Sequence, residues 1–541
     1  MAVCLFFYQP QFKNGKEQCK MKKSFRIISV LLAVLMLASL LMPMSAVANV
    51  RTSDPVVYVR GQGTPLYNAK GEQIYPVEVV DGYIGNAVKE CMPVFLDAVR
   101  TNQWDAYSDA LYEAVYPIFE PIALDKNGEA SDGSGIDWTW SRSTLKNTKK
   151  NGTYGMRDYM FYYDWRLDPW AVAEDLSDYI DAVIAVTGAK KVNLIGRCEG
   201  ACVTQAYLKK FGTSKINNYC LYSQALSGVN TVSGTFSGKI KLDAASIDRY
   251  ADYYMNVNNT TVNDLLQSTI DLAVATNGLG LATSYVNEIY AKAYASILPR
   301  LVLATYGTMP GIWAMVSLAD YDDAMALNFT GVEKEYSGLI EKIKNFHAKV
   351  AVPFENDLKS MSHKGIDIAV VTKYGFQSIP LFENNEVISD GASTVENTSF
   401  GATTAVVGQT LSAEYIADRN AKGFGNYISP DRQIDMSTAL IPKKTWIVKG
   451  LEHSVFPDCV EELISAFFIT DGDMTVDTYD VFPQFTVYDE KSKTLSPMTA
   501  QNSTDSWEDG GLFARLYRFF TSLLNTLIKM IEKMFNFDFT N

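Results

Sequence analysis

Residues 192–210 have the sequence VNLIGRCEGACVTQAYLKK, and this stretch decides the fold. A short apolar run (192–195) leads into a Gly-x-Cys-x-Gly turn, and apolar residues at helical spacing follow as far as a glycine at position 212. The pattern predicts a buried strand, a tight turn and a helix. Such a turn lifts the side chain of its central residue, Cys198, above the end of a sheet. Gly196 and Gly200 leave room where strand and helix nearly touch, so a larger residue at either position should clash.

The flanking segments alternate between strand and helix. Strands are predicted at 55–60, at 159–163 and within 216–226, and a helix opens at Pro169 and closes at Gly188. Strands also resume at 366–371 and 445–448. This alternation predicts an α/β protein with a mostly parallel sheet covered on both faces.

Helical spacing replaces the strand pattern in the middle of the chain. Runs such as 261–275 and 286–304 are predicted helices, as are residues 84–122, whereas 126–155 is predicted to be a surface loop. We therefore expect a helical cap inserted into the α/β core. The predicted divisions are a signal peptide at 1–48, core at 49–226, cap at 227–349, core again at 350–470, and a C-terminal extension at 471–541.

A cysteine nucleophile needs a base, and the chain has only three histidines. His453 follows a predicted strand in a loop just before a helix, where a histidine can reach a nucleophile at the same end of the sheet. His347 and His363 lie in polar, lysine-containing surroundings and are predicted surface residues. His453 is therefore the predicted base.

The acid that orients this histidine is expected between Cys198 and His453. Asp390 is the predicted acid, because an Asp-Gly turn can aim its carboxylate at an imidazole and stabilise the imidazolium. The alternative is that Asp390 merely shapes the turn, and Glu396 is the reserve candidate. The predicted oxyanion donors are the backbone N–H of Glu199, at the start of the helix, and the loop of Gln62 and Gly63. Together these groups predict acyl transfer through an acyl-thioester intermediate.

The string Tyr163-Asp164-Trp165-Arg166, followed by the Cys198 turn, Asp390 and His453 in that order, resembles the lecithin:cholesterol acyltransferase-like α/β-hydrolases. The likeness covers residues 54 to about 468, and the cap segment 308–313 (TMPGIW) is also similar to that family. The resemblance implies an α/β-hydrolase fold with a helical cap, an acyl ester or lipid substrate, a mobile lid over an apolar acyl site, and no metal or organic cofactor.

Two departures from the family pattern bear on the chemistry. The family normally has serine where this chain has Cys198, which favours thioester chemistry or transfer to an acceptor other than water. The family's acid sits in D-G-D-x-T-V, but the third position here is Ala392. A matching string, DGDMTV at 471–476, follows His453, and this order predicts a surface loop rather than the acid. An Arg166–Asp164 pair beside a buried Trp165 could equally be a structural anchor.

Composition and termini bound the remaining possibilities. A net charge of -13, with 47% hydrophobic residues, indicates a globular protein and excludes a nucleic-acid binder. Basic residues before an apolar run (27–44) and Ala46-Val47-Ala48 predict an exported protein, with an uncleaved membrane anchor as the alternative and residues 1–20 as a possible over-extended start. The amphipathic helix predicted from Leu512 to Phe537 could dock on the protein, on a partner or on a membrane surface.

The cysteines leave two alternatives open. Removal of the signal peptide leaves an odd set of five, with no zinc spacing and no disulfide framework, namely Cys91, Cys198, Cys202, Cys220 and Cys459. One alternative pairs Cys198 with Cys202 or Cys459 in a disulfide. The other is a catalytically silent surface or binding protein that keeps the scaffold.

Overall fold

The computed structural model describes most of the chain between residues 51 and 503. The described residues are 51–77, 83–149, 152–244, 246–247, 278–363, 366–376, 378, 387–470, 474–478 and 481–503. The predicted signal peptide, the helix from Leu512 to Phe537, the helical run at 261–275 and residues 471–473 of the DGDMTV string lie outside them.

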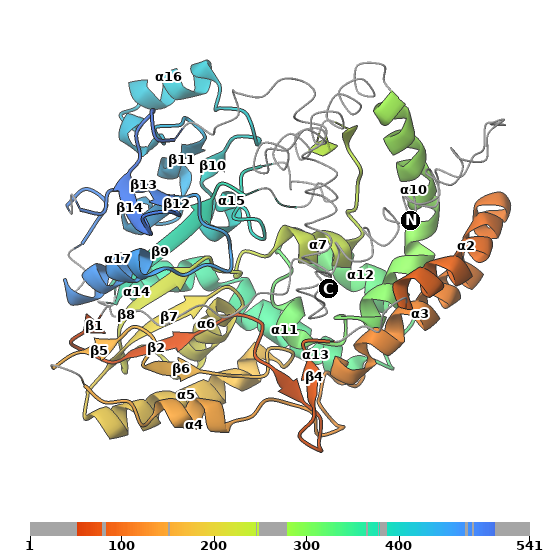
Figure 1. Cartoon of the computed structure of the whole chain (residues 1–541), viewed down its shortest axis with the longest axis horizontal. Helices are drawn as coiled ribbons and strands as arrows, with labels where there is room; N and C mark the ends of the chain where they lie inside the picture. The colour runs from red at the N-terminus through yellow and green to blue at the C-terminus, as the bar shows by residue number, and fades with distance from the viewer. Residues whose placement is uncertain are drawn as a thin grey trace.

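An eight-stranded sheet organises the described residues (Figure 1). Its strands, from edge to edge, are β14 (Thr494–Pro497), β13 (Phe485–Asp489), β12 (Thr445–Lys449), β9 (Asp367–Tyr374), β8 (Ile216–Tyr222), β7 (Val192–Arg197), β2 (Val56–Val59) and β6 (Tyr159–Phe161). All neighbours are parallel except β13 and β14. The predicted α/β class with a mostly parallel sheet is confirmed.

Apolar clusters cover both faces of this sheet. Val57, Leu194 and Val370 belong to the cluster that also holds residues of α5 (Pro169–Thr187) and α6 (Gly200–Phe211). Their strand neighbours Val56 and Ile195 belong to a second cluster, which holds residues of α17 (Asp458–Ile469). Successive residues of a strand point to opposite faces, so these strands carry apolar residues on both faces because both faces are buried.

The described residues between β8 and β9 are largely helical. They form α7 (Asn230–Ser237), α10 (Gly278–Ala304), α11 (Pro310–Trp313), α12 (Tyr321–Phe329), α13 (Ser337–Phe346), η3 (His347–Ala351) and α14 (Phe354–His363). In Figure 1, α10 lies beside α2 (Tyr83–Thr101) and α3 (Asp105–Phe119), away from the sheet. These three helices share a separate apolar cluster.

Several short elements went unpredicted. The expected surface loop at 126–155 contains α4 (Thr139–Thr144) and β5 (Tyr154–Gly155), which pairs with β1 (Arg51–Thr52). Strands β13 and β14 extend the sheet beyond residue 470, because β13 pairs in parallel with the buried β12. The other short elements are β3 (Leu66–Tyr67), β4 (Gln73–Tyr75), η2 (Glu120–Ile122), α15 (Val395–Thr398), β10 (Thr403–Thr404), α16 (Ala413–Ala421), η4 (Gly425–Tyr427), β11 (Ile434–Asp435), η5 (Met436–Thr438) and η6 (Pro442–Lys444).

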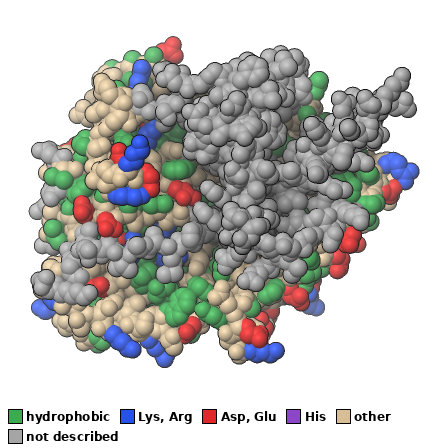
Figure 2. All heavy atoms as spheres, viewed as in Figure 1, with side chains coloured by type: hydrophobic (Ala, Val, Ile, Leu, Met, Phe, Trp, Pro, Cys, Tyr) green, Lys and Arg blue, Asp and Glu red, His purple; other side chains and the backbone are tan. Residues whose placement is uncertain are grey.

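Charges of both signs are scattered over the described surface that Figure 2 shows, with apolar side chains between them. Lys and Arg side chains lie singly or in small groups among acidic ones in this view. Within the described ranges, none of the helices is both long enough and apolar enough to cross a membrane.

Candidate active site

The Cys198 turn joins β7 to α6 at the carboxyl end of the sheet. Cys198 has a φ of 52°, in the left-handed region that non-glycine residues rarely adopt. A Cβ added to Gly196 would lie 2.4 Å from Thr204 Oγ1, and one added to Gly200 would lie 2.3 Å from the carbonyl oxygen of Val59. Only glycine fits these two positions, because strand and helix approach each other there. The turn thus holds Cys198 in a strained conformation, with its side chain partly exposed.

Asp390 and His453 meet at the same end of the sheet. Asp390 lies in the segment after β9 and His453 lies in the loop after β12, and both are buried. The Asp390 carboxylate is 2.7 Å from His453 Nδ1, and the backbone N–H of His453 donates to the Asp390 carbonyl at 2.8 Å. Asp390 Oδ1 also accepts from the backbone N–H of Ser393 at 2.8 Å. The carboxylate therefore both shapes its turn and orients the imidazole.

Cys198 and His453 lie close enough that each shifts the pKa of the other. Burial alone would raise the pKa of the Cys198 thiol, but His453, Arg197 and the Glu199 backbone N–H together lower it. Burial alone would lower the pKa of His453, but Asp390 and Cys198 raise it to about 9. For Asp390, the effect of burial is outweighed by His453 and Lys373, which lower its pKa. The lowered pKa of Cys198 and the raised pKa of His453 both favour a thiolate beside an imidazolium.

The predicted oxyanion donors belong to segments that flank Cys198. Glu199 follows Cys198 at the N-cap position of α6, and its backbone N–H helps to lower the pKa of the thiol. The loop that contains Gln62 and Gly63 runs past Cys198, because a Cβ added to Gly61 would lie 3.2 Å from the sulfur. A helix N-terminus and a neighbouring backbone loop are groups that can stabilise a developing oxyanion.

The Glu199 side chain points into the interior and is completely buried. The Gln62 amide lies beside its carboxyl group and opposes the rise in its pKa. Burial, together with Cys198 and Asp164, nevertheless raises the pKa of Glu199 well above its ordinary value. These effects favour the neutral, protonated form of the Glu199 carboxyl group.

Other sequence candidates lie apart from this site. Glu396, the reserve candidate for the acid, is exposed in the first turn of α15. Asp390, not Glu396, contacts His453. His347 stacks on Tyr321 with ring centroids 3.4 Å apart, so it is half-buried rather than a surface residue. The side chain of His363 lies outside the described set.

The Tyr163–Arg166 string forms a structural anchor. Arg166 donates to both carboxylate oxygens of Asp164, at 2.9 and 2.7 Å, and all three of Asp164, Trp165 and Arg166 are buried. Residues 310–313 form α11, and a Cβ added to Gly311 would lie 2.1 Å from the carbonyl oxygen of Trp165. The string therefore fixes α11 against the end of β6.

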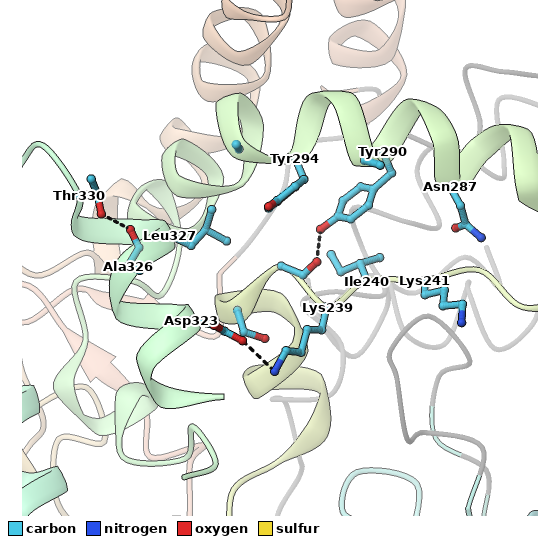
Figure 3. Close-up of a pocket in the computed structure, with 14 residues that line it drawn as sticks. Lys239, Ile240, Lys241, Asn287, Tyr290, Tyr294, Asp323, Ala326, Leu327 and Thr330 are labelled. Atoms are coloured by element: carbon cyan, nitrogen blue, oxygen red, sulfur yellow. Dashed lines mark hydrogen bonds and ion pairs between the residues drawn. The ribbon is translucent and has the colours of Figure 1, made fainter. Parts of the chain in front are cut away.

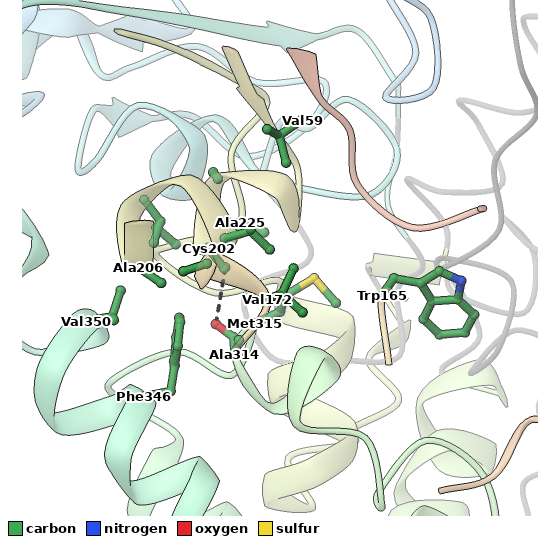
Figure 4. Close-up of a cluster of buried hydrophobic side chains, with 14 of the residues drawn as sticks. Val59, Trp165, Val172, Cys202, Ala206, Ala225, Ala314, Met315, Phe346 and Val350 are labelled. Carbon is green, nitrogen blue, oxygen red and sulfur yellow. Dashed lines mark hydrogen bonds between the residues drawn. The ribbon is translucent and has the colours of Figure 1, made fainter. Parts of the chain in front are cut away.

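A disulfide to Cys198 is excluded by the structure, and that alternative was wrong. Cys198, Cys202 and Cys459 all carry free thiols. Cys202 Sγ donates to the carbonyl of Ala314 at 3.6 Å, inside an apolar cluster (Figure 4). The Cys202 side chain therefore points into the packing of α6 against the residues at the end of α11.

Sequence reasoning missed two cations beside this pair. Lys373 lies on β9 and donates to the carbonyl of His453 at 2.7 Å, and Arg197 donates to the same oxygen at 2.9 Å. The available signal was a lysine that follows an apolar run within a predicted buried strand (367–374, DIAVVTKY). A charged residue there requires partners, and this requirement could have marked it.

Among the described residues there is no group of three or more His, Cys, Asp or Glu side chains that could bind a metal ion. A cavity of about 940 Å³ lies between α7, α10 and α12 (Figure 3). Lys239 at its wall pairs with Asp323 at 3.0 Å, and Tyr290 donates to the Gly238 carbonyl at 2.8 Å. None of the residues predicted for the active site lines this cavity.

Comparison with known proteins leaves the family open. No family model matches the sequence, and no curated protein matches it. Among solved structures, the chain is similar to a chain from the crystal structure of the Tle4-Tli4 complex. The match has 13% sequence identity and a TM-score of 0.22, and it covers 59% of this chain and 75% of the other.

Proposed function

We propose that this protein is an acyl hydrolase or acyltransferase of the α/β-hydrolase type, acting on an ester, thioester or lipid through Cys198, His453 and Asp390. One observation carries the proposal. Cys198 is held in a left-handed turn between strand and helix, and the pKa of its thiol is lowered by a histidine that a buried carboxylate orients. A nucleophile, a base and an orienting group in this relation are the parts that acyl transfer requires. The likeness of residues 163–166 to the lecithin:cholesterol acyltransferase-like enzymes is consistent with it.

Each step of the reaction has a residue for it. Nδ1 of His453 is bonded to Asp390, so Nε2 takes the Cys198 proton. The thiolate adds to the acyl carbonyl, and the Glu199 N–H stabilises the oxyanion. Collapse of the adduct breaks the bond to the leaving group, which takes the proton from His453, and leaves an acyl-thioester on Cys198. His453 then accepts a proton from water, an alcohol or an amine, whose oxygen or nitrogen attacks the thioester carbonyl. The C–S bond breaks, and His453 returns the proton to the released Cys198 thiolate.

The test is acylation of the intact protein by short ester and thioester probes, followed by mass spectrometry. We expect an acyl adduct on Cys198 of the wild type, and none on Cys198→Ala. Cys202→Ala is the matched control, since it removes a thiol one helical turn away that points into the core, and it should still acylate. No adduct and no turnover with either probe class would reject the proposal and favour a silent binding protein.

A further inference from the structure

A buried lysine forms hydrogen bonds to the loop that contains the candidate base. Lys373 is completely buried on β9, and its ammonium donates to the carbonyls of Glu452 at 2.7 Å, His453 at 2.7 Å and Val455 at 3.1 Å. An ammonium has three protons, so every donor is used. The loop after β12 is thereby tied to β9, the strand that precedes Asp390.

Arg197, the last residue of β7, contacts the same loop. It is the residue before Cys198, and its guanidinium donates to the His453 carbonyl at 2.9 Å. Tyr222, opposite Arg197 on β8, donates to the Val455 carbonyl at 2.6 Å, and its ring lies 4.7 Å from the Lys373 ammonium. Lys373 and Arg197 therefore both donate to the backbone carbonyl of His453, the candidate base.

The fold alone gives little reason to keep a charge in this place. Removing an ammonium from water is costly, and a neutral donor could satisfy carbonyl oxygens without that cost. Burial lowers the pKa of Lys373 to about 7, while Asp390, Glu452 and Cys198 favour its charged form and Arg197 opposes it. The groups that keep the ammonium charged include two members of the candidate triad.

We propose that Lys373 is a positioning residue of this site, which fixes His453 against Cys198 and, together with Arg197, supplies positive charge that stabilises the thiolate. This role of Lys373 rests on the proposed function, in which Cys198 is the nucleophile. Its test needs no substrate, because the reactivity of a thiol follows the fraction present as thiolate.

The experiment measures alkylation of Cys198 by iodoacetamide across a pH series, with the Cys198 peptide quantified by mass spectrometry. In Lys373→Met we expect the midpoint of the alkylation profile to move up by about one pH unit, because the electrostatic interaction between the ammonium and the thiolate is lost. The rate difference should be largest below pH 7, where Lys373 carries its charge, and should shrink above it. An unchanged midpoint would overturn the inference.

Lys449→Met is the matched control for loss of a buried lysine. Lys449 lies opposite Tyr374 on the adjacent strand β12, and its ammonium donates to the Ser503 carbonyl at 2.7 Å and pairs with Asp431 at 3.1 Å. We expect Lys449→Met to be less stable yet to keep the wild-type alkylation midpoint. An equal shift in both variants would make the effect unspecific and overturn the inference.

Lys373→Gln covers the case in which Lys373→Met does not fold, because its amide still offers N–H donors to the loop but carries no charge. The midpoint should rise in this variant as well. If neither variant folds, the ammonium belongs to the fold rather than to the site, and the inference is rejected. A wild-type thiol that titrates at its ordinary pKa would instead count against the proposed function, so the two failures can be told apart.

Discussion

At the scale of single residues, the contact between Asp390 and His453 determines the state of the thiol. The carboxylate bonds to Nδ1 at 2.7 Å in a buried setting, where water screens the charges little. Asp390 is the first of the groups that oppose the effect of burial on His453 and raise its pKa to about 9. Among the groups that favour the imidazolium, this carboxylate therefore has the largest effect.

Asp390→Asn should lower the pKa of His453. Without the carboxylate, only Cys198 still opposes the effect of burial, so the pKa should fall from about 9 toward the ordinary 6.5 of histidine. The chain has only three histidines, so NMR of protein labelled with 13C-histidine can follow the titration, with the His453 signal assigned from His453→Gln. Glu396→Gln, an exposed acid six residues away, should leave the titration unchanged. A His453 signal that still titrates near pH 9 in Asp390→Asn would contradict this account.

Glu199 should make stability depend on pH in the opposite sense from an ordinary surface acid. In the folded protein the pKa of Glu199 is raised above the ordinary 4.5. Its contribution to the free energy of unfolding is therefore fully present below pH 4.5 and is lost as the pH rises toward the folded pKa. Glu199→Gln removes this loss. In denaturant unfolding, the variant should gain stability relative to the wild type by up to about 1.4 kcal/mol for each pH unit across that window.

Glu396→Gln is again the control, because an exposed acid should give the same difference at pH 5 and pH 8. Identical pH profiles for Glu199→Gln and the wild type would show that the Glu199 carboxyl is ionised in the folded protein.

The candidate residues could be predicted because each carries a local signal. The glycines on either side of Cys198, the Asp-Gly turn and the scarcity of histidine are all visible in the sequence. Lys373 carries only the weaker signal of a charge within a predicted buried strand, and the acceptor of both Lys373 and Arg197 is a backbone carbonyl of a loop about 80 and about 256 positions away. Backbone acceptors have no residue identity, so no pattern of side chains could have indicated this contact.

At the scale of elements, the approach of α6 to β2 and β7 limits what the turn can contain. Alanine is a better helix former than glycine by about 1 kcal/mol, so propensity alone would favour Gly200→Ala. The added Cβ, however, would lie 2.3 Å from the Val59 carbonyl oxygen and 2.7 Å from that of Arg60. These are backbone atoms of the sheet, which cannot rotate away.

Gly200→Ala should therefore be destabilising by about 1–3 kcal/mol or more in denaturant unfolding, despite its better helix propensity. Alkylation of Cys198 should also change, because α6 has to shift. Gly135→Ala is the control, as its Cβ would have nothing nearer than Asp164 Oδ2 at 3.8 Å. Wild-type stability of Gly200→Ala would mean that α6 does not pack against β2 as closely as the structure places it.

Elements with one dominant periodicity were predictable, and those that depend on a distant partner were not. The helix α5 has an N-cap at Asp168, a proline at its first position and a left-handed Gly188 at its end, and its predicted bounds are confirmed. Strands β13 and β14 are short, and β14 is largely exposed. Such strands exist because β12 offers an edge to pair with, which local sequence does not encode.

At the scale of the whole molecule, the described residues contain apolar cores that are separate from one another. Phe95, Trp104 and Ile297 belong to the cluster shared by α2, α3 and α10, whereas the clusters on the two faces of the sheet contain the residues of β7, β8 and β9. Regions with separate cores can open separately, each with its own free energy.

Phe95→Ala should loosen the three-helix region while leaving the sheet intact. Truncation of a buried phenylalanine costs about 3–5 kcal/mol, and Phe95 belongs to this cluster, with Tyr107 at 5.1 Å between ring centroids. Hydrogen exchange read by mass spectrometry should show faster exchange in α2, α3 and α10, and unchanged protection in β7, β8 and β9. Leu176→Ala, in the core between α5 and the sheet, should instead speed exchange in the strands. Equal acceleration of exchange in both regions by Phe95→Ala would mean that the helices and the sheet unfold as one unit. Alkylation of Cys198 at its wild-type rate in this variant would place the Cys198 turn in the part that stays folded.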